Sequence, residues 1–271
     1  MDITVSIVTY KNDPQKLNKL FESLNHSSLE ISVHIMDNSH TDDLEHLIKK
    51  YKVHYTHNGK NPGYGSAHNI LMKESLYNAK YHLVLNPDIH FEDNVLEKLY
   101  SYMEEHRDIG LIMPKVLYPD GSLQYLCKLL PRPSDLILRR FFQPLKLIEK
   151  VNSKFELRFA DYDNIMDVPY LSGCFMFLRK DALHKAGLFD ERFFMYFEDT
   201  DLSRRIHRHY RTVYYPHVTI YHDYEKGSYK DKGLLWAHLK SAIRYFNKWG
   251  WFFDKDRRKI NNKTINNLNN R

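Results

Sequence analysis

The strongest constraint on the fold of this 271-residue chain is a regular alternation over its first 110 residues, where short apolar runs alternate with segments of helical periodicity. The first run is Ile3–Val8, and Asp13-Pro14, a pair typical of a helix start, follows it. Continued along the chain, the pattern predicts strands over residues 3–8, 31–36, 53–56 and 81–85. Because helices separate these strands, we predict an α/β fold with a mostly parallel central sheet flanked by helices.

Polar residues follow the predicted strands at the points where the strands end. They are Thr9-Tyr10, Asp37-Asn38, the segment Asn58–Gly63, and Asn86-Pro87-Asp88. In open parallel sheets, ligands bind beyond the carboxyl ends of the strands. We therefore expect these residues to line the ligand-binding site.

The second half of the chain has a less regular pattern. Residues 116–125 surround Pro119-Asp120-Gly121 and indicate a hairpin, and residues 174–178 have the composition of a buried strand. We expect a helix to begin in the polar cluster at residues 196–201 and two short strands to follow, over residues 213–215 and 218–221.

Three further segments complete the predicted organisation. Residues 131–165 combine prolines, basic pairs and aromatics, and indicate a helical or partly mobile excursion over the site. Residues 232–249 have the pattern of the last helix, and the Asn- and Lys-rich end after it is expected to be frayed.

The composition indicates a soluble, cytoplasmic protein. No apolar run approaches the length of about 18–20 residues that crosses a bilayer. The N-terminus, Met1–Thr4, lacks the basic residues and cleavage site of a secretory signal. The two cysteines, Cys127 and Cys174, fit a reducing compartment.

The positive charge of the chain is concentrated at its end. Residues 226–271 hold 12 Lys and Arg against 3 Asp and Glu, whereas the whole chain has a formal net charge of +6. Aromatic residues such as Trp236 and Trp251-Phe252-Phe253 are interleaved with these cations. The pattern is typical of a helix that lies on an anionic membrane, and equally of a docked C-terminal helix with a solvated face. Nucleic acid is disfavoured, because no nucleic-acid module is recognisable.

Asn86-Pro87-Asp88 is a candidate metal site, because an Asp at the carboxyl end of a strand can offer Mg²⁺ or Mn²⁺ a hard oxygen ligand. The alternative is ordinary turn chemistry, in which Asp88 ends the strand and caps the next element.

The segment Asn61–Asn69 places Gly63 and Gly65 just before a predicted helix. Glycine allows a close backbone approach, and a helix N-terminus favours an anionic diphosphate, so this segment is a candidate donor-binding loop. It matches neither a dinucleotide fingerprint nor a P-loop, and a plain loop is the alternative.

Glu198-Asp199-Thr200-Asp201 is a candidate catalytic cluster at a helix start. An ion pair from Asp201 to Arg205 accounts for Asp201. Glu198 and Asp199 are adjacent and must point in different directions, so one of them can face the site. The aromatic residues before them are expected to raise a carboxylate pKa, as a general base requires. His222 follows a strand and is a weaker candidate ligand.

Six segments occur in one order along the chain: Ser6–Tyr10, Met36–Ser39, Asn61–Asn69, Leu85–Asp88, Leu171–Met176 and Gly187–Leu202. Together they resemble the family 2 glycosyltransferases of the GT-A fold, and more narrowly the bacterial rhamnosyltransferases of O-antigen and cell-wall polysaccharide assembly. The resemblance covers about residues 3–225. The segment Trp236–Ser241 is similar to the end of enzymes that add rhamnose to a GlcNAc-diphosphate polyprenol.

The resemblance implies a domain organisation. A GT-A domain over residues 1–225 would have a Rossmann-like sheet, with the nucleotide-sugar-binding half in residues 1–110 and a smaller acceptor-side, catalytic half in residues 111–225. Residues 226–271 would form the basic, aromatic C-terminal helix and tail.

The resemblance also implies roles for single residues. Asp199 matches the catalytic base, and Asp88 matches the last residue of an Asp-x-Asp motif that binds Mg²⁺ or Mn²⁺. The chain departs from that motif at Asn86, so the motif alone does not fix a requirement for metal. His222 matches a position near the metal or the diphosphate. The implied donor-binding residues are Thr9, Tyr10, Asp37, Gly63, Gly65, Asn69, Asn86 and Arg205.

The implied activity is an inverting transfer of a sugar, with L-rhamnose from dTDP-L-rhamnose as the expected donor and a lipid-linked saccharide as the acceptor. The basic tail would then hold the enzyme on the inner face of the cytoplasmic membrane. The alternatives are a transferase for another nucleotide sugar and a catalytically silent carbohydrate-binding or scaffolding module. A nucleotidyltransferase is disfavoured, because Thr9–Asp13 is not a glycine-rich basic loop.

Overall fold

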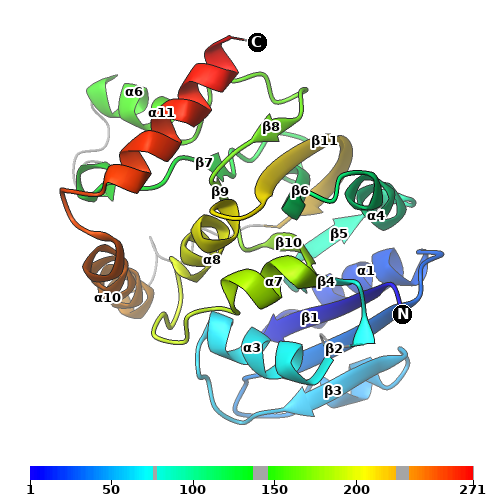
Figure 1. The fold of residues 1–271 in the computed structure, drawn as a ribbon. Coiled ribbons are helices and arrows are strands. Elements are labelled where there is room, and N and C mark those ends of the chain that lie inside the picture. Colours follow the sequence, from blue (N-terminus) through cyan, green and yellow to red (C-terminus); the bar gives the residue numbers. More distant parts are fainter. Residues whose placement is uncertain (76–77, 137–145, 224–231, 271) are drawn as a thin grey trace.

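The computed structural model describes residues 1–75, 78–136, 146–223 and 232–270, and its centre is one sheet of nine strands (Figure 1). Along the sheet the order is β3-β2-β1-β4-β10-β6-β11-β5, and β8 pairs with Val213 and Tyr214 near the start of β11. The strands are β1 (Ile3–Thr9), β2 (Ile31–Asp37), β3 (Val53–His57), β4 (Tyr81–Leu85), β5 (Ile89–Phe91), β6 (Ile109–Leu117), β8 (Met166–Asp167), β10 (Phe175–Arg179) and β11 (Arg211–His222). A second, two-stranded sheet joins β7 (Cys127–Lys128) to β9 (Tyr170–Leu171).

The first four strands confirm the pattern predicted from the sequence. β1 pairs in parallel with β2 on one side and with β4 on the other, and β2 pairs in parallel with β3. β11 runs parallel to β6, whereas β10, β5 and β8 are antiparallel to their neighbours. Four of the eight pairings are thus parallel and four are antiparallel, but six of the nine strands point the same way, and β10 joins the two halves of the sheet.

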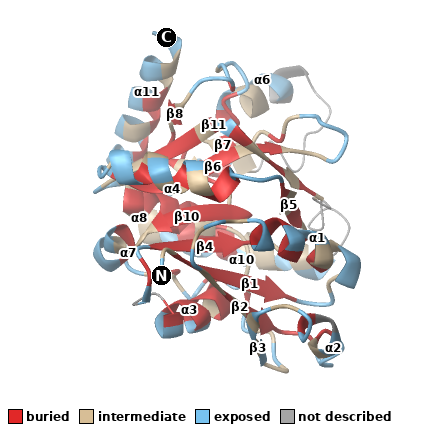
Figure 2. Ribbon diagram, turned by 90° about the vertical axis from the view of Figure 1, so that its right-hand side faces the viewer, coloured by how far each residue is buried: buried red, intermediate tan, exposed pale blue. Residues whose placement is uncertain are grey.

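Helices cover both faces of the sheet, and the strands between them are buried (Figure 2). Ile3, Val5 and Ile7 of β1 join the main core with the apolar side of α1, whereas Val8 packs with Ala67 of α3 in a separate cluster. Because side chains alternate along a strand, α1 and α3 lie on opposite faces. The helices of this part are α1 (Pro14–Asn25), α2 (Glu45–Ile48), α3 (Tyr64–Ser75), α4 (Val95–Glu105), α6 (Lys146–Phe155), α7 (Lys180–Ala186) and α8 (Glu198–His207).

One expectation for the second half needs correction, and one central strand was missed. The predicted strands at residues 213–215 and 218–221 are one strand, β11, whose register against β6 shifts between Tyr215 and Thr219, around Pro216. Strand β6 was not predicted, although it lies in the middle of the sheet. The hairpin at residues 116–125 is confirmed, with Leu123 bridged to Leu117. Residues 137–145 of the predicted excursion, and the predicted domain boundary at residues 225–226, lie outside the described residues.

The expectation of a frayed end is wrong, because α11 (Lys255–Asn269) follows α10 (Lys232–Trp249). The Asp254 side chain caps α11 by accepting a hydrogen bond from the Arg257 backbone N–H. Asn261 is buried, and its amide both donates to and accepts from the backbone of Leu130, each at 2.9 Å. Specific partners, rather than helix propensity, hold this polar segment in place. None of the helices in the described residues is both long and apolar enough to span a bilayer.

One face of α10 is docked on the body of the protein. Ala242, Tyr245 and Phe246 pack against Phe193 and Phe197, the residues that lead into α8. The sequence left open whether this helix docks or meets a membrane, and the structure shows that this face docks.

The buried ion pair between Arg204 of α8 and Asp254 ties the C-terminal helices to the sheet domain. The two side chains form a bidentate contact at 2.7 and 2.8 Å and are 1% and 2% exposed. The Arg204 guanidinium also stacks on the ring of Trp249 at 4.1 Å. Removing one partner would leave the other charge buried without compensation.

We predict that Asp254→Ala lowers the free energy of unfolding by about 3–5 kcal/mol, because it strands the Arg204 charge and removes the α11 cap. The matched control is Asp256→Ala, which removes an exposed pair with Arg208. That change should cost less than about 1 kcal/mol. Urea denaturation followed by circular dichroism measures both, and equal effects would contradict the prediction.

Candidate active site

The nucleotide-side residues predicted from the sequence lie at the carboxyl edge of β1 and β2. Thr9 ends β1 and is in register with Asp37, the last residue of β2. The buried Asp37 carboxylate accepts hydrogen bonds from the Ser39 backbone N–H at 3.0 Å and the Tyr55 hydroxyl at 3.1 Å. Tyr10 is 42% exposed. The structure thus brings Thr9, Tyr10 and Asp37 together, and Tyr10 is the member of this group that is open to solvent.

Tyr64, at the start of α3, links two parts of the site through its hydroxyl group. The hydroxyl oxygen lies 3.0 Å from Asn86 Oδ1, just beyond β4, and 2.8 Å from the Gly173 carbonyl oxygen. The hydroxyl has a single hydrogen, which it can donate to either of these oxygens. The sequence analysis did not single out Tyr64, although it stands between the two glycines of the segment at residues 61–69.

Asp88 and His222 face each other across two antiparallel strands. His222 ends β11 and is in register with Ile89 of β5, which places its ring beside Asp88. The distance from His222 Nε2 to Asp88 Oδ1 is 3.4 Å, and Asn86 Nδ2 lies 3.4 Å from the same ring nitrogen. The structure therefore brings together Asp88 and His222, the predicted metal ligands, and Asn86, a predicted donor-binding residue.

The pair of Asp88 and His222 favours a positive charge between them. Asp88 Oδ1 is buried and accepts no hydrogen bond within the described part of the chain. Burial alone would lower the pKa of His222, but Cys174 and Asp88 raise it to about 10. A proton or a divalent cation can supply the charge that this pair lacks.

A carboxylate and an imidazole fit Mg²⁺ or Mn²⁺ as a partial ligand set. Among the described residues, no group of three or more His, Cys, Asp or Glu side chains is arranged to hold a metal ion. Mg²⁺ commonly takes one or two protein carboxylates and completes its shell with substrate phosphates and water. Asp88 and His222 would therefore hold the ion together with the diphosphate of a bound nucleotide.

Asp199 lies half-buried in the first turn of α8, and its carboxylate is oriented by four groups. Oδ2 accepts hydrogen bonds from the Gly173 backbone N–H at 2.9 Å and the Tyr170 hydroxyl at 3.3 Å. Oδ1 accepts from both the backbone N–H and the hydroxyl of Thr200. A Cβ atom at Gly173 would lie only 3.1 Å from that of Asp199, so the missing side chain permits this approach.

The neighbouring Glu198 faces α3, where a Cβ added to Gly65 would lie 3.4 Å from the Glu198 Cβ. Glu198 is buried, and its Oε2 has no hydrogen-bond partner among the described residues. Burial, followed by the charge of Asp199, raises the pKa of Glu198 well above its usual value. The raised pKa thus belongs to Glu198 and not to Asp199, the candidate base, which is the one of the two that is partly open to solvent. The role of Asp199 as a base stays a prediction.

The backbone enters α8 through two residues of unusual conformation. Tyr196 and Phe197 both have a φ of 69°, in the left-handed region. The ring of Phe197 lies 5.3 Å from that of Tyr245 on α10. The docked face of α10 therefore contacts the turn at Tyr196 and Phe197, which directly precedes α8 and Asp199.

A chain of contacts connects the two acidic groups that the sequence singled out. It runs from Asp199 through Gly173, the Tyr64 hydroxyl and Asn86 to the His222–Asp88 pair. Asp199 and Asp88 thus belong to one polar cluster and are not separated by apolar core.

Gly63 and Gly65 are in close contact with other parts of the protein. A Cβ at Gly63, whose φ is +101°, would lie 2.3 Å from the Phe194 carbonyl oxygen, and one at Gly65 would lie 3.0 Å from the Cβ of Phe189. The close approach that the sequence predicted is therefore to the segment before α8. A diphosphate at the start of α3 stays a prediction.

Asn69 and Arg205 hold the same segment. The Asn69 amide accepts from the Phe189 backbone N–H at 3.0 Å and donates to its carbonyl oxygen at 2.9 Å. Arg205 forms the predicted ion pair with Asp201 at 2.8 Å and donates to the carbonyl oxygens of residues 186–188. In the structure both side chains brace the chain between α7 and α8, and their role toward the donor stays a prediction.

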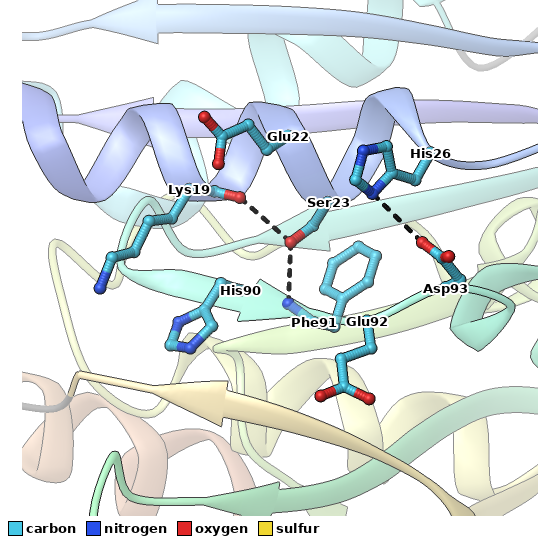
Figure 3. Close-up of a pocket in the computed structure, with 8 residues that line it drawn as sticks. All are labelled: Lys19, Glu22, Ser23, His26, His90, Phe91, Glu92 and Asp93. Atoms are coloured by element: carbon cyan, nitrogen blue, oxygen red, sulfur yellow. Dashed lines mark hydrogen bonds and ion pairs between the residues drawn. The ribbon is translucent and has the colours of Figure 1, made fainter.

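A groove of about 510 Å³ lies between α1 and β5 (Figure 3). The Ser23 hydroxyl on α1 accepts a hydrogen bond from the Phe91 backbone N–H on β5 at 2.9 Å, and His26 forms an ion pair with Asp93 at 3.1 Å. None of the predicted site residues lines this groove.

Several curated proteins are similar in sequence to this chain. It is 26% identical to the N-acetylglucosaminyl-diphospho-decaprenol L-rhamnosyltransferase of Mycobacterium tuberculosis, over 92% of this chain and 86% of that protein. It is 27% identical to the rhamnosyltransferase WbbL of Escherichia coli, over 84% of this chain and 87% of that protein. The low-salt glycan biosynthesis hexosyltransferase Agl10 of Haloferax volcanii is 24% identical over 76% of this chain, and the match spans only 62% of Agl10.

Among solved structures, the crystal structure of GalNAc-T7 with UDP, GalNAc and Mn²⁺ superimposes with a TM-score of 0.60 and 14% identity, over 83% of this chain and 43% of that one. This likeness shows that the fold is that of GT-A glycosyltransferases. Residues 4–187, more than half of the chain, match the profile of the family described as glycosyl transferase family 2. The chain therefore belongs to glycosyl transferase family 2 and is a glycosyltransferase.

Proposed function

We propose that the enzyme is an inverting glycosyltransferase that moves L-rhamnose from dTDP-L-rhamnose onto a lipid-linked saccharide, with GlcNAc-diphosphate-polyprenol as the acceptor, in bacterial surface polysaccharide synthesis. The observation that carries the proposal is the convergence of Asp199 with the Asp88–His222 pair around Tyr64. The named activities of two relatives, which match over most of both chains, favour rhamnose as the sugar.

In the proposed reaction, Asp199 removes the proton from an acceptor hydroxyl while the oxygen of that hydroxyl attacks the anomeric carbon of the donor. The new bond forms on the face opposite the diphosphate, and the bond from that carbon to the diphosphate oxygen breaks, so the configuration is inverted. The donors from Gly173 and Thr200 keep the carboxylate in one orientation while the proton moves. Mg²⁺ or Mn²⁺ held by Asp88 and His222 would neutralise charge on the departing diphosphate.

An anionic acceptor fits the surroundings of Asp199. Tyr170 contacts Asp199 through its hydroxyl, and the ammonium group of Lys128 lies 5.3 Å from the centre of the Tyr170 ring. The positive charge of Lys128, near the carboxylate that would act on the acceptor, would attract the diphosphate of a lipid-linked saccharide.

The exposed side of the C-terminal helices supports a peripheral position on the inner face of the cytoplasmic membrane. Trp236 and Ile243 of α10 are 64% and 49% exposed and lie seven residues apart, on one face of the helix. Phe252 and Phe253, after α10, are 75% and 95% exposed. The exposed cations around them are Lys240, Arg244, Lys255, Arg258 and Lys259. Aromatic groups beside cations suit the boundary between anionic headgroups and acyl chains.

We predict that Asp199→Asn folds and binds dTDP but transfers sugar about 10²–10⁴-fold more slowly, because loss of a general base costs that much. Asp181→Asn is the matched control, since Asp181 is an exposed carboxylate in the first turn of α7. Single-turnover transfer assays measure the effect, and normal turnover by Asp199→Asn would remove this residue from the mechanism.

We predict that dTDP-L-rhamnose is consumed faster than other nucleotide sugars, and that chelation with EDTA lowers its transfer until Mn²⁺ or Mg²⁺ is restored. The physical reason is the buried Asp88 oxygen, which has no hydrogen-bond donor among the described residues and lies 3.4 Å from His222 Nε2, so that a divalent ion can take the place of the proton between these two groups. A panel of nucleotide sugars, assayed for hydrolysis and transfer with each ion, measures both effects. Full activity in EDTA would exclude a metal role, and preference for another donor would exclude rhamnose.

We predict that the double variant Phe252→Ser, Phe253→Ser binds vesicles containing phosphatidylglycerol at least about tenfold more weakly, because each buried aromatic contributes about 1.5–3 kcal/mol. The variant is preferable to deletion of the tail, since deletion would strand the buried Arg204. Ile70→Ser, at an exposed position on α3, is the control. Vesicle sedimentation gives the result, and unchanged binding by the double variant contradicts a membrane role for these aromatics.

A further inference from the structure

The hairpin after β6 carries a buried glutamine that contacts His222. Gln124 is 3% exposed, and its backbone N–H donates to the Val116 carbonyl oxygen at 2.9 Å across the hairpin. Its side-chain amide lies against the end of β11, 98 residues further along the chain. The mechanism described above gives this residue no part.

The orientation of the Gln124 amide is fixed by two backbone carbonyl groups. Its Nε2 lies 2.7 Å from the His222 carbonyl oxygen and 3.3 Å from that of Leu117. Both of these oxygens can only accept hydrogen bonds, so the nitrogen of the amide must face them. The amide oxygen, Oε1, is thereby directed at the His222 ring, 3.0 Å from Nδ1.

The direction of Oε1 decides which nitrogen of His222 carries a hydrogen. An amide oxygen has no hydrogen to give, so the contact at 3.0 Å requires an N–H at Nδ1. In the neutral ring, Nε2 is then the nitrogen with a lone pair, and it is Nε2 that lies 3.4 Å from Asp88 Oδ1. The His222 lone pair that can bind a metal ion is therefore on the side of Asp88, and the N–H of the ring is on the side of the hairpin.

We propose that Gln124 is a positioning residue, which fixes the orientation and the tautomer of His222 so that Nε2 and Asp88 can hold a divalent cation together. The inference rests on the metal role given to Asp88 and His222 in the proposed function. Metal-bound histidines commonly donate their other ring N–H to an oxygen acceptor, and loss of that acceptor typically weakens metal binding about 10–100-fold.

The rival explanation is that Gln124 merely braces the chain, because it also joins the hairpin to β11. Two substitutions separate the explanations. Gln124→Met removes the acceptor for Nδ1–H together with both donors to the carbonyl groups. Gln124→Glu keeps an oxygen acceptor for Nδ1–H but provides at most one donor for the two carbonyl oxygens.

The experiment measures the dissociation constant of Mn²⁺ in the presence of dTDP, by electron paramagnetic resonance of the unbound ion, for the full-length protein and both variants. We expect Gln124→Met to bind Mn²⁺ about 10–100-fold more weakly and Gln124→Glu to remain within about threefold of wild type. Melting temperatures, recorded alongside, should fall in both variants, because both lose donors to the chain. Thr212→Val is the control, since it removes the hydroxyl partner of His207 Nδ1 from the same strand and should leave Mn²⁺ binding unchanged.

Three results would overturn the inference. Equal weakening in the Met and Glu variants would show a bracing role, and unchanged Mn²⁺ binding in Gln124→Met would show no role toward the metal. Absence of Mn²⁺ binding by the wild-type protein would remove the premise as well. Transfer of rhamnose by a protein that binds no Mn²⁺ would leave the proposed sugar transfer standing, so the two failures can be told apart.

Discussion

Hydrogen bonding along both edges of β10 is the interaction on which the arrangement of the site depends. On one edge β10 pairs with β4, and on the other with β6, so this strand joins the parallel strands of the first half to those of the second. Its register, with Phe175 opposite Leu85, sets Gly173 and Cys174 beside the end of β4. The Gly173 backbone can then accept from Tyr64 and donate to Asp199, which connects the two halves of the site.

The parts of the fold that local chemistry dictates could be predicted from the sequence. Six of the seven residues of the buried strand Ile3–Thr9 are β-branched, and the helix after it has both an Asp cap and a Pro in its first turn. The C-terminal helix at Lys255–Asn269 was missed because its Asn- and Lys-rich composition suggests a frayed end. Its stability comes from the buried contacts of Arg257 and Asn261 with distant parts of the chain, which no local pattern encodes.

The same distinction applies to the site. Asp88, Asp199 and His222 could be singled out because strand ends and helix starts are local features, and the structure gathers these residues. Tyr64 and Gln124 were missed because their partners lie 109 and 98 residues away, respectively. Gly63 and Asn69 suggested a phosphate cradle, yet the contacts they make are with the segment that leads into α8, since a glycine's tolerance for close approach does not reveal what approaches it.

The left-handed conformations of Tyr196 and Phe197 make the turn before α8 dependent on the end of the chain. Each such non-glycine residue is held about 1–3 kcal/mol above its relaxed state. The rings of Tyr245 and Phe246 confine Phe197 and keep it there. If α10 came away, the turn could relax and the first turn of α8 would lose its fixed direction. Proteolysis near the C-terminus would therefore inactivate the enzyme without touching a substrate contact.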